Sequence, residues 1–168
     1  MAQVTELPHA AIKPVWIWDI TYEVGPGQTN YRPDVQLVQA LINEVSTRLG
    51  LVDFRKGTPG PLGLIYPPLK QLNEDGWWGP ETAAAVDSYQ ENALRRGGGV
   101  RDGRVDPVHP LLARLKGDPV GPNYIMGVAG IQRRTMFRLN ADHVMLKGRM
   151  MDESEFPALL RADLKKKT

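Results

Sequence analysis

The chain has 168 residues, of which 42% are hydrophobic and 24% charged; it has no cysteine and a net charge of +2 at neutral pH. These values are typical of a soluble globular protein, and the lack of cysteine excludes disulfides, cysteine nucleophiles and cysteine metal ligands. The small net charge does not favour nucleic acid as a partner. No stretch approaches the roughly 18 apolar residues of a membrane span, and the 17 glycines and 14 prolines predict many turns and long loops.

The first residues, MAQVTELPHAAIKPVW, contain no basic segment followed by an apolar run. They are therefore not typical of a secretory signal peptide. We expect synthesis in the cytoplasm and, if the protein acts outside the cytosol, delivery by a different route.

Residues 15–24, VWIWDITYEV, are rich in β-branched and aromatic side chains. In an extended chain, one face would carry Trp16, Trp18, Ile20, Tyr22 and Val24. This alternation predicts a strand with one buried face, ended by the Gly-Pro-Gly that follows. We expect Trp16 and Trp18 to be buried against other elements; if exposed, they would mark a partner surface.

Two amphipathic helices follow. The first is predicted to begin at Pro33 and to end near Gly50, with apolar residues stepping by three and four positions. The second is predicted from Pro80 to about Arg96, with an inner stripe of Thr82, Ala85, Val86, Tyr89 and Ala93. Between them, residues 51–74 are rich in proline and glycine, which predicts a loop with at most a short strand at 62–66.

Short elements are predicted in the rest of the chain. A third helix is expected at 107–115, strands at 124–128, 135–139 and 143–146, and a terminal helix starting from the capping-box sequence at 152–155. The predicted fold class is therefore α+β. It has a helical core at 33–116, an N-terminal strand extension at 1–32, and a β-rich C-terminal extension with a terminal helix at 117–168. We expect the two extensions to pack together.

Three segments share the register of a known motif: an apolar-Gln pair in residues 35–43, DGWWGPET at 75–82, and AVDSYQ at 85–90. Together they resemble the peptidoglycan-binding domain of the small three-helix type, over residues 33–116. A second Asp-Gly turn at 101–107 also matches, although Asp106 stands where that family usually has glycine. The long segment at 51–74 departs from the family's short connection between the first two helices.

The residues of the motif also suit its local structure. Asp75 and Gly76 suit a tight turn, through side-chain capping and a positive φ respectively, while Gly79 and Pro80 suit the start of a helix. The resemblance implies structural roles for a set of residues that comprises Asp75, Gly76, Trp78, Tyr89, Asp102 and Gly103. Within this set, Trp78 would insert beneath the turn and Tyr89 would lie in the core.

The resemblance further implies a binding site for a peptidoglycan stem peptide or glycan beside this turn. Its candidate ligand-binding residues are Trp77, Gly79, Glu81, Thr82 and Gln90, and backbone amides at the start of the second helix would receive a carboxylate. Trp77, at the family's variable position, would offer an exposed indole. The alternatives are that Trp77 packs against the 51–74 segment, and that Gln90 is a structural hydrogen-bonding residue.

The leading interpretation is a non-catalytic cell-wall-binding module, suited to a phage particle or a contractile secretion apparatus. One alternative is a structural or adaptor protein whose additions bind a protein partner or form a homo-oligomer. The other is a peptidoglycan hydrolase with its site in the additions, although no catalytic motif is present. No cofactor is predicted, and the three histidines match no metal-binding spacing.

Overall fold

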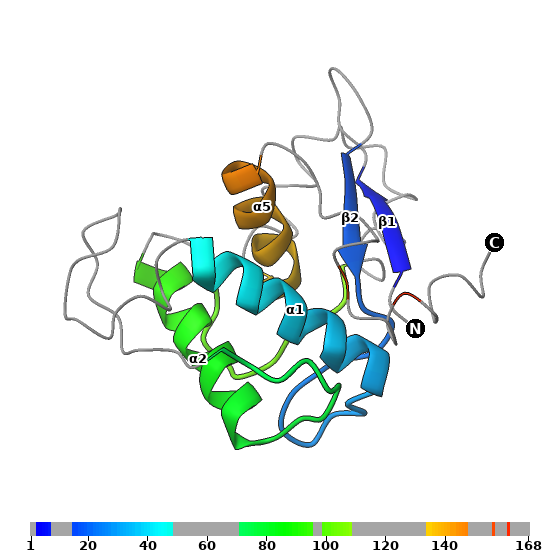
Figure 1. Ribbon diagram of the computed structural model, residues 1–168, viewed down its shortest axis with the longest axis vertical. Coiled ribbons are helices and arrows are strands. Elements are labelled where there is room, and N and C mark those ends of the chain that lie inside the picture. Colours follow the sequence, from blue (N-terminus) through cyan, green and yellow to red (C-terminus); the bar gives the residue numbers. More distant parts are fainter. Residues whose placement is uncertain are drawn as a thin grey trace.

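The computed structural model describes residues 3–7, 15–48, 71–95, 99–108 and 134–147, together with Phe156 and Arg161. These residues contain three helices and one two-stranded antiparallel sheet (Figure 1). The strands are β1 (Gln3–Leu7) and β2 (Val15–Asp19), and the helices are α1 (Arg32–Arg48), α2 (Pro80–Arg95) and α5 (Thr135–Lys147). None of the helices in the described part of the chain is long and apolar enough to cross a membrane.

Helix α1 packs against both α2 and α5, and α5 also packs against β2 (Figure 1). The core between these elements consists of apolar side chains that recur at helical spacing. The largest fully buried ones include Leu37, Leu41 and Ile42 of α1, Tyr89 of α2, and Met136 and Leu139 of α5. The sequence-based predictions of α1 and α2 are confirmed, and the whole predicted inner stripe of α2 is buried.

The predicted strand at 15–24 is too long, because β2 ends at Asp19. The Asp19 carboxylate accepts hydrogen bonds from the N–H groups of Ile20, at 3.0 Å, and Val108, at 2.9 and 3.1 Å. Farther along, Val24 forms an isolated two-bond bridge with Val105. The segment after β2 is therefore anchored to the loop that follows α2.

Trp18 is only 5% exposed, and its ring stands edge-on to Phe156 with 4.7 Å between ring centroids. The hypothesis that Trp18 marks a partner surface is therefore wrong, and its predicted burial is confirmed. Its backbone is also fixed, because the Asn140 side chain accepts from its N–H at 2.9 Å and donates to its carbonyl at 2.8 Å. This pair of bonds ties β2 to α5. The side chain of Trp16 is not among those that the structure describes.

The strands predicted at 135–139 and 143–146 are wrong, because residues 135–147 form the single helix α5. Its described buried positions, which are Thr135, Met136, Leu139, Asn140, Asp142 and His143, follow a helical rather than an alternating period. The described part of the C-terminal extension is therefore helical, not β-rich.

Pro107 and Val108 belong to no helix, which contradicts the start of the third predicted helix. The remaining predicted elements, at 62–66, 109–115, 124–128 and 152–166, lie outside the described residues apart from Phe156 and Arg161.

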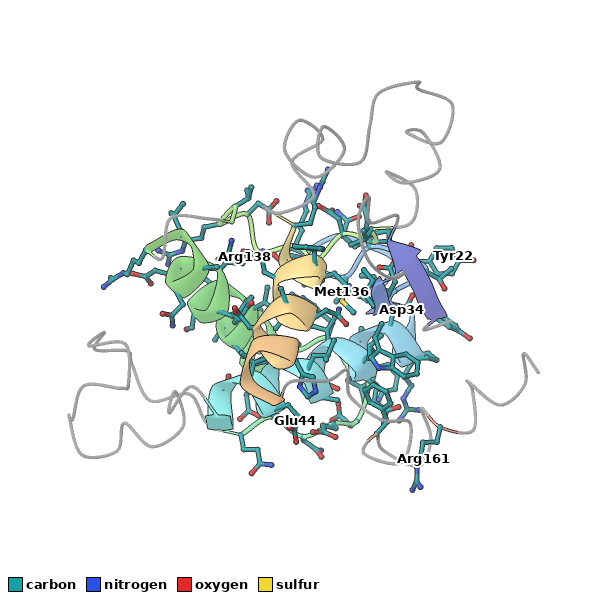
Figure 2. All side chains as sticks on the ribbon, turned by 90° about the horizontal axis from the view of Figure 1, so that it is seen from above. Tyr22, Asp34, Glu44, Met136, Arg138 and Arg161 are labelled. Carbon is teal, nitrogen blue, oxygen red and sulfur yellow. The ribbon has the colours of Figure 1, made fainter. Side chains whose placement is uncertain are left out.

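A buried carboxylate joins the start of α1 to the segment after β2 (Figure 2). Asp34 is fully buried, and one of its oxygens accepts the N–H of Tyr22 at 2.9 Å. Burial raises the pKa of Asp34, while hydrogen bonds from the backbone N–H groups of Tyr22 and Thr21 act in the opposite direction. The ring of Tyr22 itself is 50% exposed, contrary to its predicted place on a buried face. It meets Tyr31 edge-on at 5.9 Å between ring centroids.

Candidate functional site

The site begins with the tight turn immediately before α2. Gly76 has φ of +75°, a conformation that favours glycine. The Asp75 carboxylate accepts the N–H of Trp77 at 2.9 Å, which is the side-chain capping that the sequence predicts. This hydrogen bond is the main reason that the pKa of Asp75 is lowered; burial opposes it, and contacts with Gln39 and Arg32 lower it further. Asp75 is therefore ionised at neutral pH.

One buried side chain of α1 holds this turn in place. Gln39, 2% exposed, accepts the N–H of Gly76 at 2.8 Å. Its Nε2 donates to the Trp77 carbonyl and the Thr82 hydroxyl, both at 3.1 Å, and to the Asp75 carboxylate at 3.2 Å. The turn and the first turn of α2 are thus both bound to α1. The sequence analysis missed this role; its only signal was the apolar-Gln pair in residues 35–43.

A second glutamine, on α2, makes the equivalent bonds and accepts one additional N–H. The Gln90 carboxamide accepts the N–H groups of Asp102, at 3.1 Å, and Gly103, at 2.8 Å. It donates to the Arg104 carbonyl at 2.7 Å, the Thr135 hydroxyl at 2.8 Å and the Asp102 carboxylate at 3.1 Å. Gln90 is 1% exposed and does not line the groove described below. Its assignment as a ligand-binding residue is therefore wrong, and the structural alternative is confirmed.

The structure thus contains two equivalent turns, each clamped by a glutamine from the preceding helix. Gly103 has φ of +70°, and the Asp102 carboxylate accepts the N–H of Arg104 at 2.9 Å, as Asp75 does for Trp77. Thr135, at the start of α5, takes the place that Thr82 has at the start of α2. Asp106, which departs from the motif, pairs with Arg134 just before α5. The sequence analysis did not connect Thr135 with the second turn, because about 30 residues separate them.

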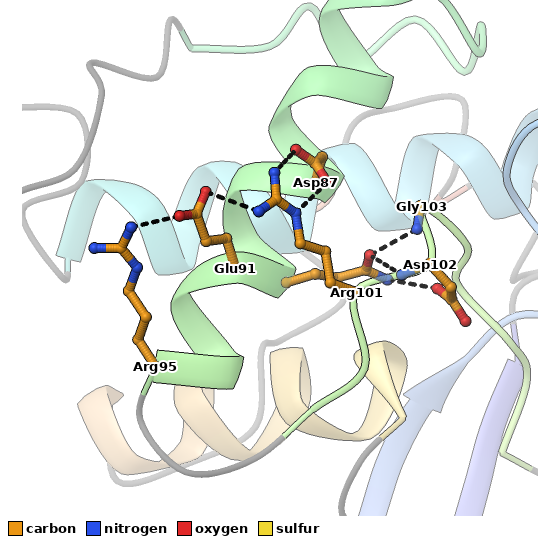
Figure 3. Close-up of polar contacts among 7 residues, drawn as sticks. Asp87, Glu91, Arg95, Arg101, Asp102 and Gly103 are labelled. Atoms are coloured by element: carbon orange, nitrogen blue, oxygen red, sulfur yellow. Dashed lines mark hydrogen bonds and ion pairs between the residues drawn. The ribbon is translucent and has the colours of Figure 1, made fainter.

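The two turns differ in what they present at the surface. At the second turn, Arg101 donates two bonds to Asp87, at 2.7 and 2.8 Å, and lies 3.4 Å from Glu91, which also pairs with Arg95 (Figure 3). The hydrogen bond from Arg101 lowers the pKa of Asp87. Exposed pairs of this kind contribute little stability. Arg104 stands here at the position that Trp77 occupies in the first turn.

The first turn borders an open groove with a volume of about 250 Å³. Its lining comprises Gln39, Leu72, Asn73, Asp75, Trp77, Gly79, Pro80, Glu81 and Thr82. Four of the five predicted ligand-binding residues are therefore gathered around one cavity. Trp77 is 64% exposed, whereas Trp78 is half-buried and packs against the core. The two adjacent tryptophans thus face different environments, as the sequence predicts.

Arg32 supports the exposed indole, and the sequence analysis did not identify it. Its guanidinium lies 4.8 Å from the centre of the Trp77 ring, and its Nε donates to the Asp75 carbonyl at 3.0 Å. Stacking of this kind stabilises an exposed pair by about 0.5–1 kcal/mol. Because Arg32 and Asp75 are 43 positions apart, no local pattern links them.

The other predicted structural residues lie where the fold needs them. Tyr89 is fully buried, and its hydroxyl donates to the Asp142 carboxylate at 2.7 Å, which joins α2 to α5. Within the described ranges, no three His, Asp or Glu side chains are grouped so that they could hold a metal ion. Comparison with family models, curated proteins and solved structures finds no match to this chain.

Proposed function

We propose that the protein is a non-catalytic cell-wall-binding module that takes a peptidoglycan stem peptide into the groove beside Trp77. The observation that carries this proposal is the indole of Trp77, 64% exposed at the wall of a cavity of about 250 Å³. Large aromatic side chains at concave surfaces are typical of ligand sites. The two clamped Asp-Gly turns add support, because they lie on the motifs that carry the resemblance to peptidoglycan-binding domains.

The groove is also preorganised. Its wall is the turn that Gln39 fixes from α1, and the indole at its rim is stacked under Arg32, 4.8 Å away. A ligand therefore meets side chains that are already ordered, which lowers the entropic cost of binding. This arrangement suits recognition of a short, flexible peptide by a small surface.

Asp75 does not suit the role of general acid for glycan hydrolysis in this groove. Cleavage of a glycan requires one carboxyl group to stay protonated and act as the general acid, with a raised pKa. Asp75 and Glu81 are the acids of the groove, and the pKa of Asp75 is lowered by its bond from the Trp77 N–H. Asp75 is thus held as a carboxylate, which suits binding better than proton donation.

Replacement of Trp77 with alanine tests this function by co-sedimentation with purified sacculi. We expect the wild-type protein to sediment and Trp77→Ala to bind about tenfold more weakly, since loss of a central aromatic contact costs roughly 1–2 kcal/mol. The melting temperature should change little, because the side chain is largely exposed. Tyr22→Ala is the matched control: it removes an aromatic ring that is 50% exposed and lies outside the groove lining. Equal binding by Trp77→Ala and Tyr22→Ala would reject the groove as the site.

A structural or adaptor role is the second candidate, and the Tyr22–Tyr31 pair favours it. The two rings meet edge-on and are 50% and 37% exposed, and exposed aromatic surface is typical of protein interfaces. Failure of the wild-type protein to sediment, together with an oligomer in light scattering that Tyr22→Ala dissociates, would support this role instead.

A further inference from the structure

The charge of the groove indicates which part of a ligand it receives. Among the nine described residues that line it, two are acidic, Asp75 and Glu81, and none is basic. Glu81 lies in the first turn of α2, where the helix dipole favours a negative charge. A carboxylate entering the groove would meet both of these acids. The expectation that the groove receives a carboxylate is therefore not supported by its lining.

The hydrogen-bond donors of the lining side chains are largely turned inward. The Nε2 of Gln39 donates to the Trp77 carbonyl of the turn, and the Thr82 hydroxyl donates to the same carbonyl at 3.3 Å. Asn73 donates to the second oxygen of Asp75 at 3.2 Å. Each carboxylate oxygen can accept more than one hydrogen bond. The described side chains of the lining thus present carboxylate oxygens and an indole, which match a ligand group that is positively charged and rich in donors.

We propose that the groove selects the ammonium group of a diamino acid side chain, held by the carboxylates of Asp75 and Glu81 beside the indole of Trp77. This inference rests on the proposed function, because it names the part of the stem peptide that enters the groove. An ammonium supplies three donors and no acceptor, and indole is the aromatic ring that attracts cations best. Arg32, outside the groove lining, already places a cation 4.8 Å from the centre of this ring.

The test uses calorimetric titration of the full chain with two synthetic probes. One is a stem pentapeptide with lysine as its third residue, and the other is the same peptide acetylated at the lysine Nζ. Acetylation removes the charge and two of the three donors while it keeps the carboxylates and the backbone. We expect the acetylated peptide to bind at least fivefold more weakly at low salt, and this difference to shrink as the salt concentration rises.

A pair of substitutions tests whether the Glu81 carboxylate contributes to binding of the lysine peptide. The test variant is Glu81→Gln, and the control is Glu91→Gln. Both substitutions remove one negative charge from α2, but Glu91 pairs with Arg95 and Arg101 at the second turn and does not line the groove. We expect Glu81→Gln to weaken binding of the lysine peptide about threefold or more, and Glu91→Gln to leave it unchanged. Glu81 is exposed, so the melting temperature of Glu81→Gln should stay close to that of the wild type.

The outcomes separate this inference from the proposed function. Equal affinity for the two peptides, or equal affinity of the two variants for the lysine peptide, would overturn ammonium recognition. A second experiment measures co-sedimentation with sacculi whose amines have been acetylated and with untreated sacculi. Strong binding to both acetylated and untreated sacculi would leave cell-wall binding intact and reject the ammonium. Absence of binding to untreated sacculi would reject both.

Discussion

Replacement of Gly76 with alanine is expected to lower the free energy of unfolding by about 2–5 kcal/mol. Gly76 has φ of +75°, and a methyl group there would lie 2.6 Å from both the carbonyl oxygen and the Cγ of Arg32. The backbone conformation costs roughly 1–2 kcal/mol for an L-residue, and displacement of packed atoms adds about 1–3 kcal/mol. The carbonyl belongs to the first residue of α1, so it cannot move aside without shifting the helix. Urea unfolding measures this loss.

Two other glycines serve as graded controls. Gly103 has φ of +70°, but a methyl group there would lie 4.0 Å from the nearest atoms, which belong to Pro26. Gly103→Ala should therefore show the backbone cost alone, about 1–2 kcal/mol. Gly79 has open space around it and directly precedes the first residue of α2, so Gly79→Ala should show only the loss of a favourable helix-capping residue, about 0.5–1 kcal/mol. If Gly76→Ala were no more destabilising than Gly103→Ala, the close approach of the turn to α1 would be wrong.

Replacement of Gln39 with leucine is expected to destabilise the protein by about 3 kcal/mol or more. The substitution keeps a buried side chain of similar size but removes every bond between the α1 carboxamide and the turn. The buried Gly76 N–H loses the acceptor that Gln39 gives it, which costs about 1–3 kcal/mol. The Trp77 carbonyl, the Thr82 hydroxyl and the Asp75 carboxylate each lose one hydrogen bond, worth about 0.5–1.5 kcal/mol apiece. Chemical denaturation gives the free energy, and the loss should be accompanied by weaker binding in the groove.

Gln36 provides the matched control on the same helix. It is 4% exposed, close to the 2% of Gln39, but its Nε2 makes one bond, to the Glu74 carbonyl at 2.7 Å. Gln36→Leu should therefore cost only about 1 kcal/mol. Because Gln90 makes the equivalent bonds at the second turn, Gln90→Leu should resemble Gln39→Leu. Similar losses for the Gln36 and Gln39 variants would contradict the clamp.

The parts of the fold that the sequence predicts correctly are those with strong local signals. The apolar periodicity of 33–49 and 80–96 gives two helices within two residues of their observed ends. The Asp-Gly pair at 75–76 gives the turn, and the motif register separates exposed Trp77 from half-buried Trp78. Each of these predictions depends on residues within one or two helical turns, where steric preference and burial act directly.

The failures share a different cause, which is contact between distant segments. Residues 135–139 contain β-branched and aromatic side chains, yet they lie in α5, where Gln90 bonds to Thr135 and the backbone of Trp18 bonds to Asn140. Likewise, β2 ends where Asp19 bonds to Val108, 89 positions away. Local propensity is a weak prior where such tertiary bonds form.

At the candidate site too, the residues with a local sequence signal are predicted and those that depend on distant contacts are not. Its aromatic wall and helix start are visible in the motif, so Trp77, Gly79, Glu81 and Thr82 are all found at the groove. Gln39 and Arg32 come from α1 and meet the turn only in the folded chain. The acidic character of the groove emerges only once its lining is known, because the sequence around the motif contains charges of both signs.

Binding of the stem peptide in the groove beside Trp77 can be followed residue by residue with nuclear magnetic resonance. The chain contains four tryptophans, so the indole N–H of Trp77 can be assigned with a Trp77→Phe variant and followed during titration with the lysine pentapeptide. The account predicts saturable shifts of this indole and of the Gly79 and Thr82 amides, while the Gly103 amide of the equivalent second turn stays in place. Shifts centred on the second turn or on Tyr22, or none at millimolar peptide, would contradict it.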